Sequence, residues 1–271
     1  MNFIKLPHFF LAVVLLSCFV ACKTEKKSTV TTKTASTHSQ EQLKTVTKAS
    51  AILDETIKAH GGKLYNQAHY QFTFRNKTYR FKNNGTHYTY ESLSHNNDTL
   101  TEDILENGTF SRKVNGEQVT LSEKKKASAI GAINSVIYFA TLPHKLNDPA
   151  VNVSYVEKTT IKGQPYEVLK VTFSQDGGGE DFEDEYHYWI NQSTKKVDFL
   201  AYNYHVNGGG VRFRSAYNVR VIDGITFQDY INYKAEVGTP LKDLPALYEA
   251  DKLKEVSKIE TQNIINLNKQ S

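Results

Sequence analysis

The sequence predicts an α+β fold built mainly of antiparallel β-strands, and three observations support that prediction. Aromatic and polar residues alternate with a period of two in many short runs, such as Tyr70–Phe74, which is typical of strands with one buried face. Turn residues such as Asn83-Asn84-Gly85 separate neighbouring runs. The uncharged segment Ala127–Pro143 is apolar nearly all round, so we expect a buried helix lying on the aromatic face. We predict about eleven strands and two or three helices.

The N-terminus has the zones of a secretory signal. The apolar run Phe9–Ala21 follows a single positive charge at Lys5 and is too short to span a bilayer. Cys22 comes next and begins an abruptly polar stretch, so the residues around it resemble a bacterial lipobox. We therefore expect a lipoprotein signal peptide over residues 1–21 and membrane anchoring through acyl chains on Cys22. Cys18 fits the same motif and is the alternative, and an ordinary secretory signal is a third interpretation.

Residues 22–46 are rich in Lys, Thr and Ser and contain few apolar side chains, which predicts a flexible tether. We expect residues 47–271 to form a single domain. The chain has two cysteines, and both precede this domain, so we expect neither a disulfide nor a catalytic thiol in it. The net charge is +4, with basic residues scattered among acidic ones, which does not indicate nucleic-acid binding.

The domain begins with an amphipathic pattern over Ala49–His60, which predicts a helix that ends at Gly61-Gly62. Short strands follow, after which Ser122 has the character of an N-cap for the apolar helix. The runs that predict these strands are Tyr70 to Phe74, Tyr79 to Phe81, Tyr88 to Tyr90, Thr101–Leu105, Thr109–Val114 and Gln118–Leu121.

Longer strands follow Asp148-Pro149. A short helix at Leu241–Ala250 and a closing strand near Glu255–Gln262 complete the predicted domain. The long strands are expected at Val153–Ile161, Tyr166–Gln175, Glu183–Ile190, Val197–Val206, Val211–Asn218 and Ile225–Lys234.

This order of helix, meander, apolar helix and long meander resembles the outer-membrane lipoprotein-carrier superfamily. The segment Tyr186-His187-Tyr188-Trp189-Ile190-Asn191, with the strand Val197–Ala201 after its turn, is similar to a hairpin common in that superfamily. The resemblance implies a curved, incompletely closed β-barrel or half-barrel with the apolar helix packed in its mouth. It also implies binding of acyl chains or other apolar ligands, although function depends on the site more than on the fold.

A closer resemblance covers most of residues 50–262 and is to a family of uncharacterised envelope lipoproteins of the Bacteroidota. It implies a fold and a cellular address but no activity. The matching stretches are Ala59–Gly62, Asn134–Phe139, Lys145–Ala150, Gly177–Asp184 and Tyr204–Gly210.

Two triple-glycine loops, Gly177–Gly179 and Gly208–Gly210, are expected at the same end of the sheet. Glycine permits positive φ and close approach of a ligand. Asp176, Glu180 and Asp181 flank the first loop and can supply oxygen ligands to Ca²⁺, the one cofactor the sequence suggests. The alternative is that both loops are plain hairpin turns.

Pairing the strands next to these loops predicts a polar face on the second half of the sheet. A turn centred near Thr194 sets His205 opposite Glu183, and the second glycine loop sets His205 opposite Arg212. If the protein is an enzyme, Glu183, His187, His205 and Arg212 are its candidate acid–base residues, because histidine titrates near neutral pH. The alternative is a solvated cross-strand charge ladder. The whole predicted face consists of Glu183, Glu185, His187, Asn203, His205, Arg212 and Arg214.

The opposite face is aromatic, and its side chains either line a ligand cavity under the apolar helix or simply fill the core. We assign no ligand contact to any single one of them, Phe72 included. The predicted aromatic face consists of Tyr70, Phe72, Phe74, Tyr79, Phe81, Tyr88, Tyr90, Tyr188, Tyr202, Tyr204 and Phe213.

Three functions therefore remain open. The first is a non-enzymatic envelope lipoprotein that holds an apolar or amphiphilic ligand between the sheet and the 127–141 helix. The second is a structural or interaction lipoprotein with a filled core that acts through its glycine-rich loops. The third is an enzyme that uses the Glu/His/Arg face, although zinc-protease and serine-hydrolase motifs are absent from the sequence. Lys23 directly after Cys22 favours the outer membrane, with the domain facing either the periplasm or the outside.

Overall fold

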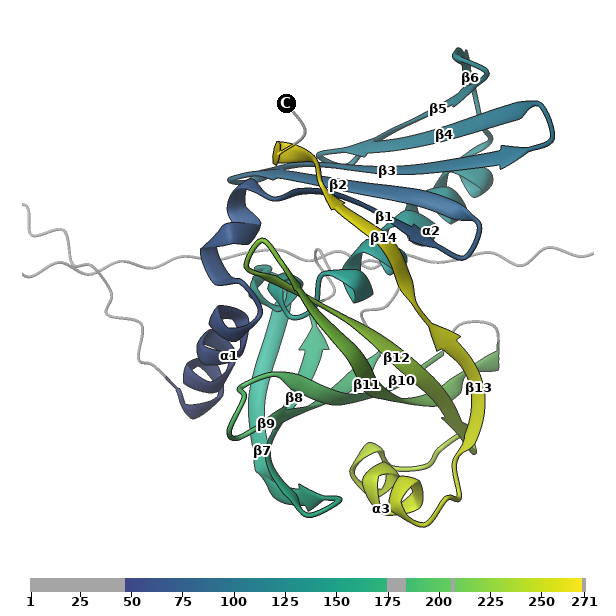
Figure 1. Ribbon diagram of the computed structural model, residues 1–271. Coiled ribbons are helices and arrows are strands. Elements are labelled where there is room, and N and C mark those ends of the chain that lie inside the picture. Colours follow the sequence, from purple (N-terminus) through teal and green to yellow (C-terminus); the bar gives the residue numbers. More distant parts are fainter. Residues whose placement is uncertain (1–46, 175–183, 206–207, 270–271) are drawn as a thin grey trace, which may run out of the picture. The chain divides into compact units, whose positions relative to one another are not determined.

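The computed structural model describes residues 47–174, 184–205 and 208–269, and Thr45–Ser271 form one compact unit. In these residues fourteen strands form two antiparallel sheets of seven strands each, and neither sheet closes into a barrel (Figure 1). The predicted fold class, mainly antiparallel β with a few helices and no complete barrel closure, is confirmed. The described residues contain three more strands than the predicted eleven, and one of them arises because the segment predicted as a single closing strand contains two.

The first sheet is a meander of consecutive hairpins with one strand added from the C-terminal end of the chain, in the order β14-β1-β2-β3-β4-β5-β6. Its register places Phe81 opposite both Tyr70 and Tyr90, so large aromatic side chains share one face. The strands are β1 (His69–Phe74), β2 (Lys77–Asn84), β3 (His87–Asn96), β4 (Thr99–Glu106), β5 (Thr109–Val114), β6 (Glu117–Val119) and β14 (Thr261–Asn266).

The second sheet is a longer meander in the order β13-β12-β11-β10-β9-β8-β7, and both of its faces are buried. Its interior strand β9 therefore lacks polar alternation: six of its seven residues are buried. The strands are β7 (Val151–Ile161), β8 (Gln164–Phe173), β9 (Glu185–Asn191), β10 (Val197–Tyr204), β11 (Gly210–Ile222), β12 (Ile225–Ala235) and β13 (Lys254–Ile259).

Helices cover the two faces of the second sheet. The helix α1 (Lys48–Ala59) buries Ala49, Leu53 and Ile57 on one face, and η5 (Leu241–Asp243) with α3 (Leu244–Glu249) covers the other. A capping box begins α1: Ser50 N–H donates to Thr47 Oγ1 at 3.1 Å, and Thr47 N–H donates to Ser50 Oγ at 2.9 Å. The predicted helices at both ends of the domain are thus confirmed to within a few residues.

The helix end at His60 fastens α1 to the second sheet. The ring Nε2 of His60 accepts the Val197 N–H at 3.2 Å, and the His60 carbonyl accepts the Thr226 N–H at 2.9 Å. Gly61 follows at φ +131°, where an added Cβ would lie 3.1 Å from Ile225 Cγ1. Burial, reinforced by the positive charge of Lys196, lowers the pKa of His60 to about 3, so its ring is neutral.

The apolar helix α2 (Glu123–Ala140) begins after Ser122 and packs on the aromatic face of the first sheet, as predicted. Only one side of it is buried, through Ala129, Ile133 and Ile137. The expectation of an all-round buried helix is wrong, because the residues facing away are small or uncharged and need no cover: Gly131, Ala132, Asn134 and Ser135 are all exposed. Among the described residues, no helix has both the length and the hydropathy to cross a membrane.

The chain returns to the first sheet through β13 and β14, which Glu260 alone separates. Figure 1 shows this passage in yellow, where β13 at the edge of the second sheet runs on into β14. The sequence predicted a single closing strand there. In the structure β14 instead pairs with β1, with Tyr70 opposite Asn266, and so joins the two ends of the domain.

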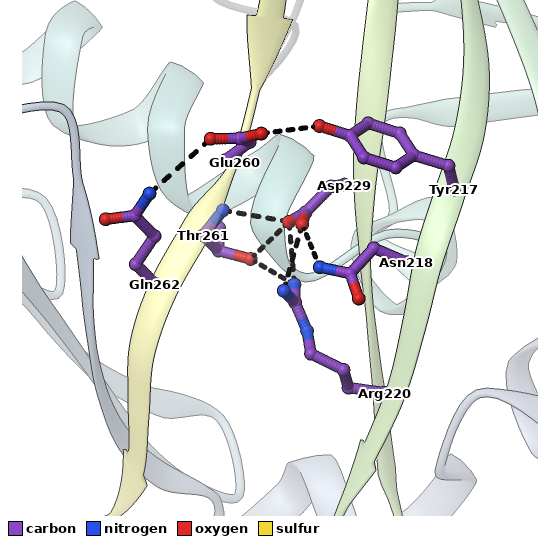
Figure 2. Close-up of polar contacts among 7 residues, drawn as sticks. All are labelled: Tyr217, Asn218, Arg220, Asp229, Glu260, Thr261 and Gln262. Atoms are coloured by element: carbon purple, nitrogen blue, oxygen red, sulfur yellow. Dashed lines mark hydrogen bonds and ion pairs between the residues drawn. The ribbon is translucent and has the colours of Figure 1, made fainter.

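A buried carboxylate fixes this crossing (Figure 2). Asp229 is 2% exposed and accepts hydrogen bonds from Arg220 Nη1 at 2.9 Å and Nη2 at 2.7 Å. Asn218 Nδ2 donates to it at 2.6 Å, and the backbone N–H of Thr261 donates at 2.9 Å. The Asp229 cluster, made of these four residues, contains a buried carboxylate paired with Arg220, and it ties the hairpin of β11 and β12 to the first residue of β14.

Candidate functional site

A pocket of about 460 Å³ lies between α2 and the two sheets, and we call it the α2 pocket. Its volume falls within the range of roughly 300–1,000 Å³ that small-molecule sites occupy. The exposed face of α2 forms one wall, the turn between β1 and β2 a second, and β11 to β14 the third. The lining residues are Phe74, Arg75, Asn76, Lys77, Tyr79, Ala132, Ser135, Val136, Phe139, Ala140, Arg214, Gln228, Tyr230, Asn232, Ser257, Ile259 and Thr261.

All charged side chains among these lining residues are positive: Arg75, Lys77 and Arg214. Burial raises the pKa of Tyr79 and of Tyr230, so both phenols remain neutral at physiological pH. The pocket therefore combines aliphatic and aromatic walls with three cations. No carboxylate belongs to the described lining.

Arg214 lies in the inner wall and is only 6% exposed. Its Nη2 donates to the hydroxyl of Tyr202 at 2.8 Å, and its guanidinium carbon lies 3.8 Å from the ring centre of Phe139. Its Nε and Nη1 are buried without a hydrogen-bond partner among the described residues. A buried guanidinium with two unused donors is costly unless another group meets it.

Two buried acceptors lie in the same wall. Gln228 donates through Nε2 to the Val197 carbonyl at 3.0 Å, but its Oε1 has no donor within the described parts of the chain. Asn232, which lies opposite Arg214 in the sheet register, leaves its Oδ1 equally unpaired. Buried polar groups are normally satisfied, so this concentration of unpaired atoms around one pocket is a feature that a bound polar group would explain.

A second pocket of about 490 Å³ follows α2 towards its N-terminus and shares Lys77, Tyr79 and Ala132 with the first. Lys124 and Lys125 add two more cations to its wall. Arg112 is paired there with Asp103, Nη2 to Oδ2 at 2.7 Å. The two pockets thus form neighbouring compartments along one side of α2, each lined by an excess of positive charge.

Most of the predicted aromatic face fills the core instead of lining the pocket. Phe72 is completely buried in the cluster between α2 and the first sheet, together with its neighbours on β1 to β3. Phe74 and Tyr79 reach the α2 pocket. Phe213 was assigned to the wrong face: it packs with Trp189 on the side of the second sheet that α3 covers.

Part of the predicted polar face is confirmed. Asn203 lies opposite Glu185 in the register of β9 and β10, as expected. Glu185, His187, Asn203 and His205 line a common pocket of about 540 Å³ with the second glycine loop, Gly208–Gly210. Glu183, the fourth acid–base candidate, lies outside the described residues.

Arg212 and Arg214 do not belong to that face. The structure pairs Arg212 with Tyr202, whereas the sequence reasoning placed it opposite His205. The offset is three residues, and because side chains alternate along a strand, an odd offset turns both arginines to the other face of the sheet. There Arg212 Nη2 donates to the Tyr204 hydroxyl at 2.6 Å, and Val211 and Phe213 occupy the places beside His187 instead.

The remaining acid–base candidates, His187 and His205, each lie beside a carboxylate. His187 Nε2 lies 3.2 Å from Glu185 Oε1, and Lys170 forms an ion pair with the same carboxylate. Burial lowers the pKa of His187, with the Glu185 charge opposing that shift in part. His205 is 61% exposed and lies 3.6 Å from Asp184. This arrangement does not bring His187, His205 and Arg212 together on one face.

The predicted calcium ligands Asp176, Glu180 and Asp181, and the first glycine loop, also lie outside the described residues. In the parts of the chain that the structure describes, no group of three acidic, histidine or cysteine side chains could hold a metal ion. The calcium site stays a prediction.

Sequence reasoning missed the polar lining of the α2 pocket, namely Arg75, Lys77, Gln228 and Asn232, and it misplaced Arg214. One signal was present: Gln228 and Asp229 interrupt the strand-forming run Ile225–Ile231. Polar residues inside a buried strand indicate either a fixed ion pair or a ligand site, and β12 contains both.

Several solved structures are similar to this chain. A LolA superfamily protein from Nitrosomonas europaea is 11% identical, with 81% of this chain and 93% of that chain covered and a TM-score of 0.46. A DUF1329 family protein from Desulfovibrio piger is 10% identical, covering 83% and 96%, with a TM-score of 0.41. The Mycobacterium tuberculosis lipoprotein LppX is 14% identical, covering 59% and 90%, with a TM-score of 0.26.

A comparison with the curated proteins found no significant match. The model of a family of unknown function, DUF6503, matches residues 5–261, which is nearly the whole sequence. The chain therefore belongs to the DUF6503 family.

Proposed function

We propose that this protein is a non-enzymatic lipoprotein of the bacterial cell envelope that holds an apolar or amphiphilic ligand in the α2 pocket. The single observation that carries the proposal is the pocket itself, a space of about 460 Å³ between one exposed helix face and two sheets. Its lining mixes apolar side chains such as Val136, Phe139 and Ile259 with a few polar groups, as ligand sites do.

The side of α2 that faces the pocket supports this proposal. A helix without charge over 127–140 exposes Ala132 and Ser135 there, although larger side chains would fill the space and bury more apolar area. Small residues on this side keep the pocket open, whereas Ile133 and Ile137 on the other side anchor the helix firmly. The helix can therefore form a fixed wall of the pocket while a ligand occupies the space beside it.

The neutral fluorophore 1-N-phenylnaphthylamine tests the proposal on the unit Thr45–Ser271, which contains all three described hydrophobic cores. We expect saturable binding with a rise in fluorescence. Ser135→Trp places an indole in the pocket and should abolish saturation. Asn134→Trp is the matched control, since Asn134 is exposed on the same helix but does not line either α2 compartment.

Failure of the fluorophore to bind, or equal binding to both tryptophan variants, would exclude the α2 pocket as a ligand site. An interaction lipoprotein acting through its glycine-rich loops would then be the better account. Equal binding to the wild type and Asn134→Trp, with none to Ser135→Trp, would place the probe in the pocket.

The proposed localisation in the cell envelope is inferred from the N-terminal residues, and we propose acylation of Cys22. Cells expressing the full chain and fed an alkyne-tagged fatty acid should label the protein. Cys22→Ser should remove the label and release the protein from the membrane fraction, while Cys18→Ser should leave both unchanged. The reverse pattern would move the anchor to Cys18.

A further inference from the structure

We propose that Arg214 receives the anionic head group of a single-chain amphiphile whose tail lies along α2. This inference rests on the proposed function and names the ligand class of the same pocket. It begins from charge: Arg75, Lys77 and Arg214 line the α2 pocket, and no carboxylate in the described lining opposes them. A cavity whose charged groups are all positive attracts anions and disfavours cationic ligands.

Arg214 differs from the two other cations in its surroundings. Arg75 is exposed in the turn between β1 and β2, and Lys77 is half-buried at the start of β2, so water can solvate both. Arg214 is 6% exposed, and among the described residues it forms no ion pair. Its contacts are the neutral hydroxyl of Tyr202 and the face of Phe139. Within the part of the chain that the structure describes, this buried guanidinium therefore has no counterion.

Two donors of Arg214 are available for that counterion. Nε and Nη1 are buried and have no partner in the described ranges, while Nη2 uses one N–H for Tyr202. Each of them lies beside Nη2, whose second N–H completes a planar fork that matches the two oxygens of a carboxylate or phosphate. Phe139 lines the same pocket and covers the guanidinium at 3.8 Å, so a rotation of its ring would bring the head group into contact.

A comparison with Arg220 shows what a structural arginine looks like in this fold. Arg220 lies six residues further along β11. Its Nε is also unpaired among the described residues, but its other two nitrogens donate to the buried Asp229, which balances its charge. Arg212, on the same face as Arg214, reaches the Tyr204 hydroxyl and lies outside the pocket lining. Only Arg214, among these three arginines of β11, combines burial, a place in the wall of a pocket and the lack of an ion-pair partner among the described residues.

The rest of the pocket fits the tail. From Arg214, the wall continues over Phe139, Val136 and Ala132, and Ala132 is shared with the second compartment along α2. Lys124 and Lys125, which line that second compartment, are exposed on the first turn of the helix. One acyl chain can follow this side of the helix, with the exposed cations attracting the amphiphile before it enters.

The test measures displacement of 1-N-phenylnaphthylamine from Thr45–Ser271 by three ligands with the same tail: laurate, dodecyl phosphate and 1-dodecanol. A charge-assisted hydrogen-bond pair contributes a factor of about 10 to 100 in affinity, so we expect the anions to bind that much more tightly than the alcohol. The relative affinities of laurate and dodecyl phosphate then show whether the site prefers a carboxylate or a phosphate head group.

Arg214→Met should bring the two anions to within about threefold of dodecanol while leaving the affinity for the neutral fluorophore unchanged. Arg212→Met is the matched control and should behave as the wild type. If Arg214→Met does not fold, the pair Arg75→Gln and Lys77→Gln, both at the rim, should still lower the association rate of the anions and weaken its dependence on salt.

Equal affinities of wild-type protein for laurate, dodecyl phosphate and dodecanol would overturn the inference but leave the proposed function intact. The same is true of an anion preference that survives in Arg214→Met. Absence of binding of the fluorophore and of all three ligands would overturn both. Loss of the anion preference in Arg214→Met alone would support the inference.

Discussion

The Asp229 cluster offers the sharpest test of how the two sheets are held together. Asp229→Asn keeps the shape of the side chain and removes its charge, which leaves the Arg220 guanidinium without a counterion. Breaking a buried ion pair from one side costs about 3–5 kcal/mol of stability. Arg220 is 27% exposed and Asp229 only 2%, so water can solvate the orphaned arginine in part. The lower end, about 3 kcal/mol, is therefore expected.

For a domain of this size, 1 kcal/mol corresponds to about 2–4 °C in Tm, so Asp229→Asn should lower Tm by about 6–12 °C. Differential scanning calorimetry of Thr45–Ser271 measures it. Glu55→Gln is the control: Glu55 is 61% exposed and pairs with Lys195 at the surface, so its loss should change Tm by at most about 2 °C.

The double variant Asp229→Leu with Arg220→Met sharpens this test, because removing both charges leaves no orphan. We expect it to be clearly more stable than Arg220→Met alone, in which a 2%-exposed carboxylate has lost its main partner. A Tm of Asp229→Asn within about 2 °C of wild type would refute the reasoning, as would additivity of Asp229→Leu alone and Arg220→Met alone in the double variant.

Three further predictions concern the remaining structure. The pKa of His60 is lowered to about 3, so below pH 6.5 the unfolded chain binds a proton there that the folded chain does not. This residue should therefore lower the free energy of unfolding by about 1.4 kcal/mol per pH unit between pH 6.5 and 3. Urea unfolding of His60→Gln should show a smaller loss of stability from pH 7 to 5 than the wild type. Gly61→Ala forces a side chain onto φ +131° against Ile225 and should cost about 1–3 kcal/mol in the same assay; no loss would refute the strain argument. Gly131→Ala, on the exposed side of α2 with no atom within 4 Å of the added Cβ, should raise stability by about 0.5–1 kcal/mol, and a decrease would mean that this side of the helix is not free.

Much of the fold could be predicted because its signals are local. The pattern over Ala49–His60 followed by two glycines predicted α1, and the alternation in Tyr70–Phe74 predicted β1 and its buried face. Ser122 predicted the start of α2. The absence of charge in α2 was over-interpreted, since alanine, glycine and serine tolerate exposure and burial alike.

The candidate site could not be predicted in the same way because its parts come from distant segments. The register of β10 and β11 depends on the geometry of the loop between them, in which Gly208 and Gly209 both have positive φ. An error of three residues at that loop moved Arg214 from the α2 pocket to the opposite face. The pairing of β14 with β1 joins residues nearly two hundred positions apart, and no local pattern specifies such a partner.

Native mass spectrometry of Thr45–Ser271, produced in a bacterial envelope and sprayed without denaturation, examines the claim that the α2 pocket holds a ligand. The claim predicts a bound molecule at near one-to-one stoichiometry in the wild type and in Asn134→Trp, and the bare mass in Ser135→Trp; organic extraction then identifies it as a single-chain amphiphile with an acidic head group. A bare mass for all three proteins, with no uptake when laurate or dodecyl phosphate is added, would contradict the claim that the α2 pocket holds a ligand.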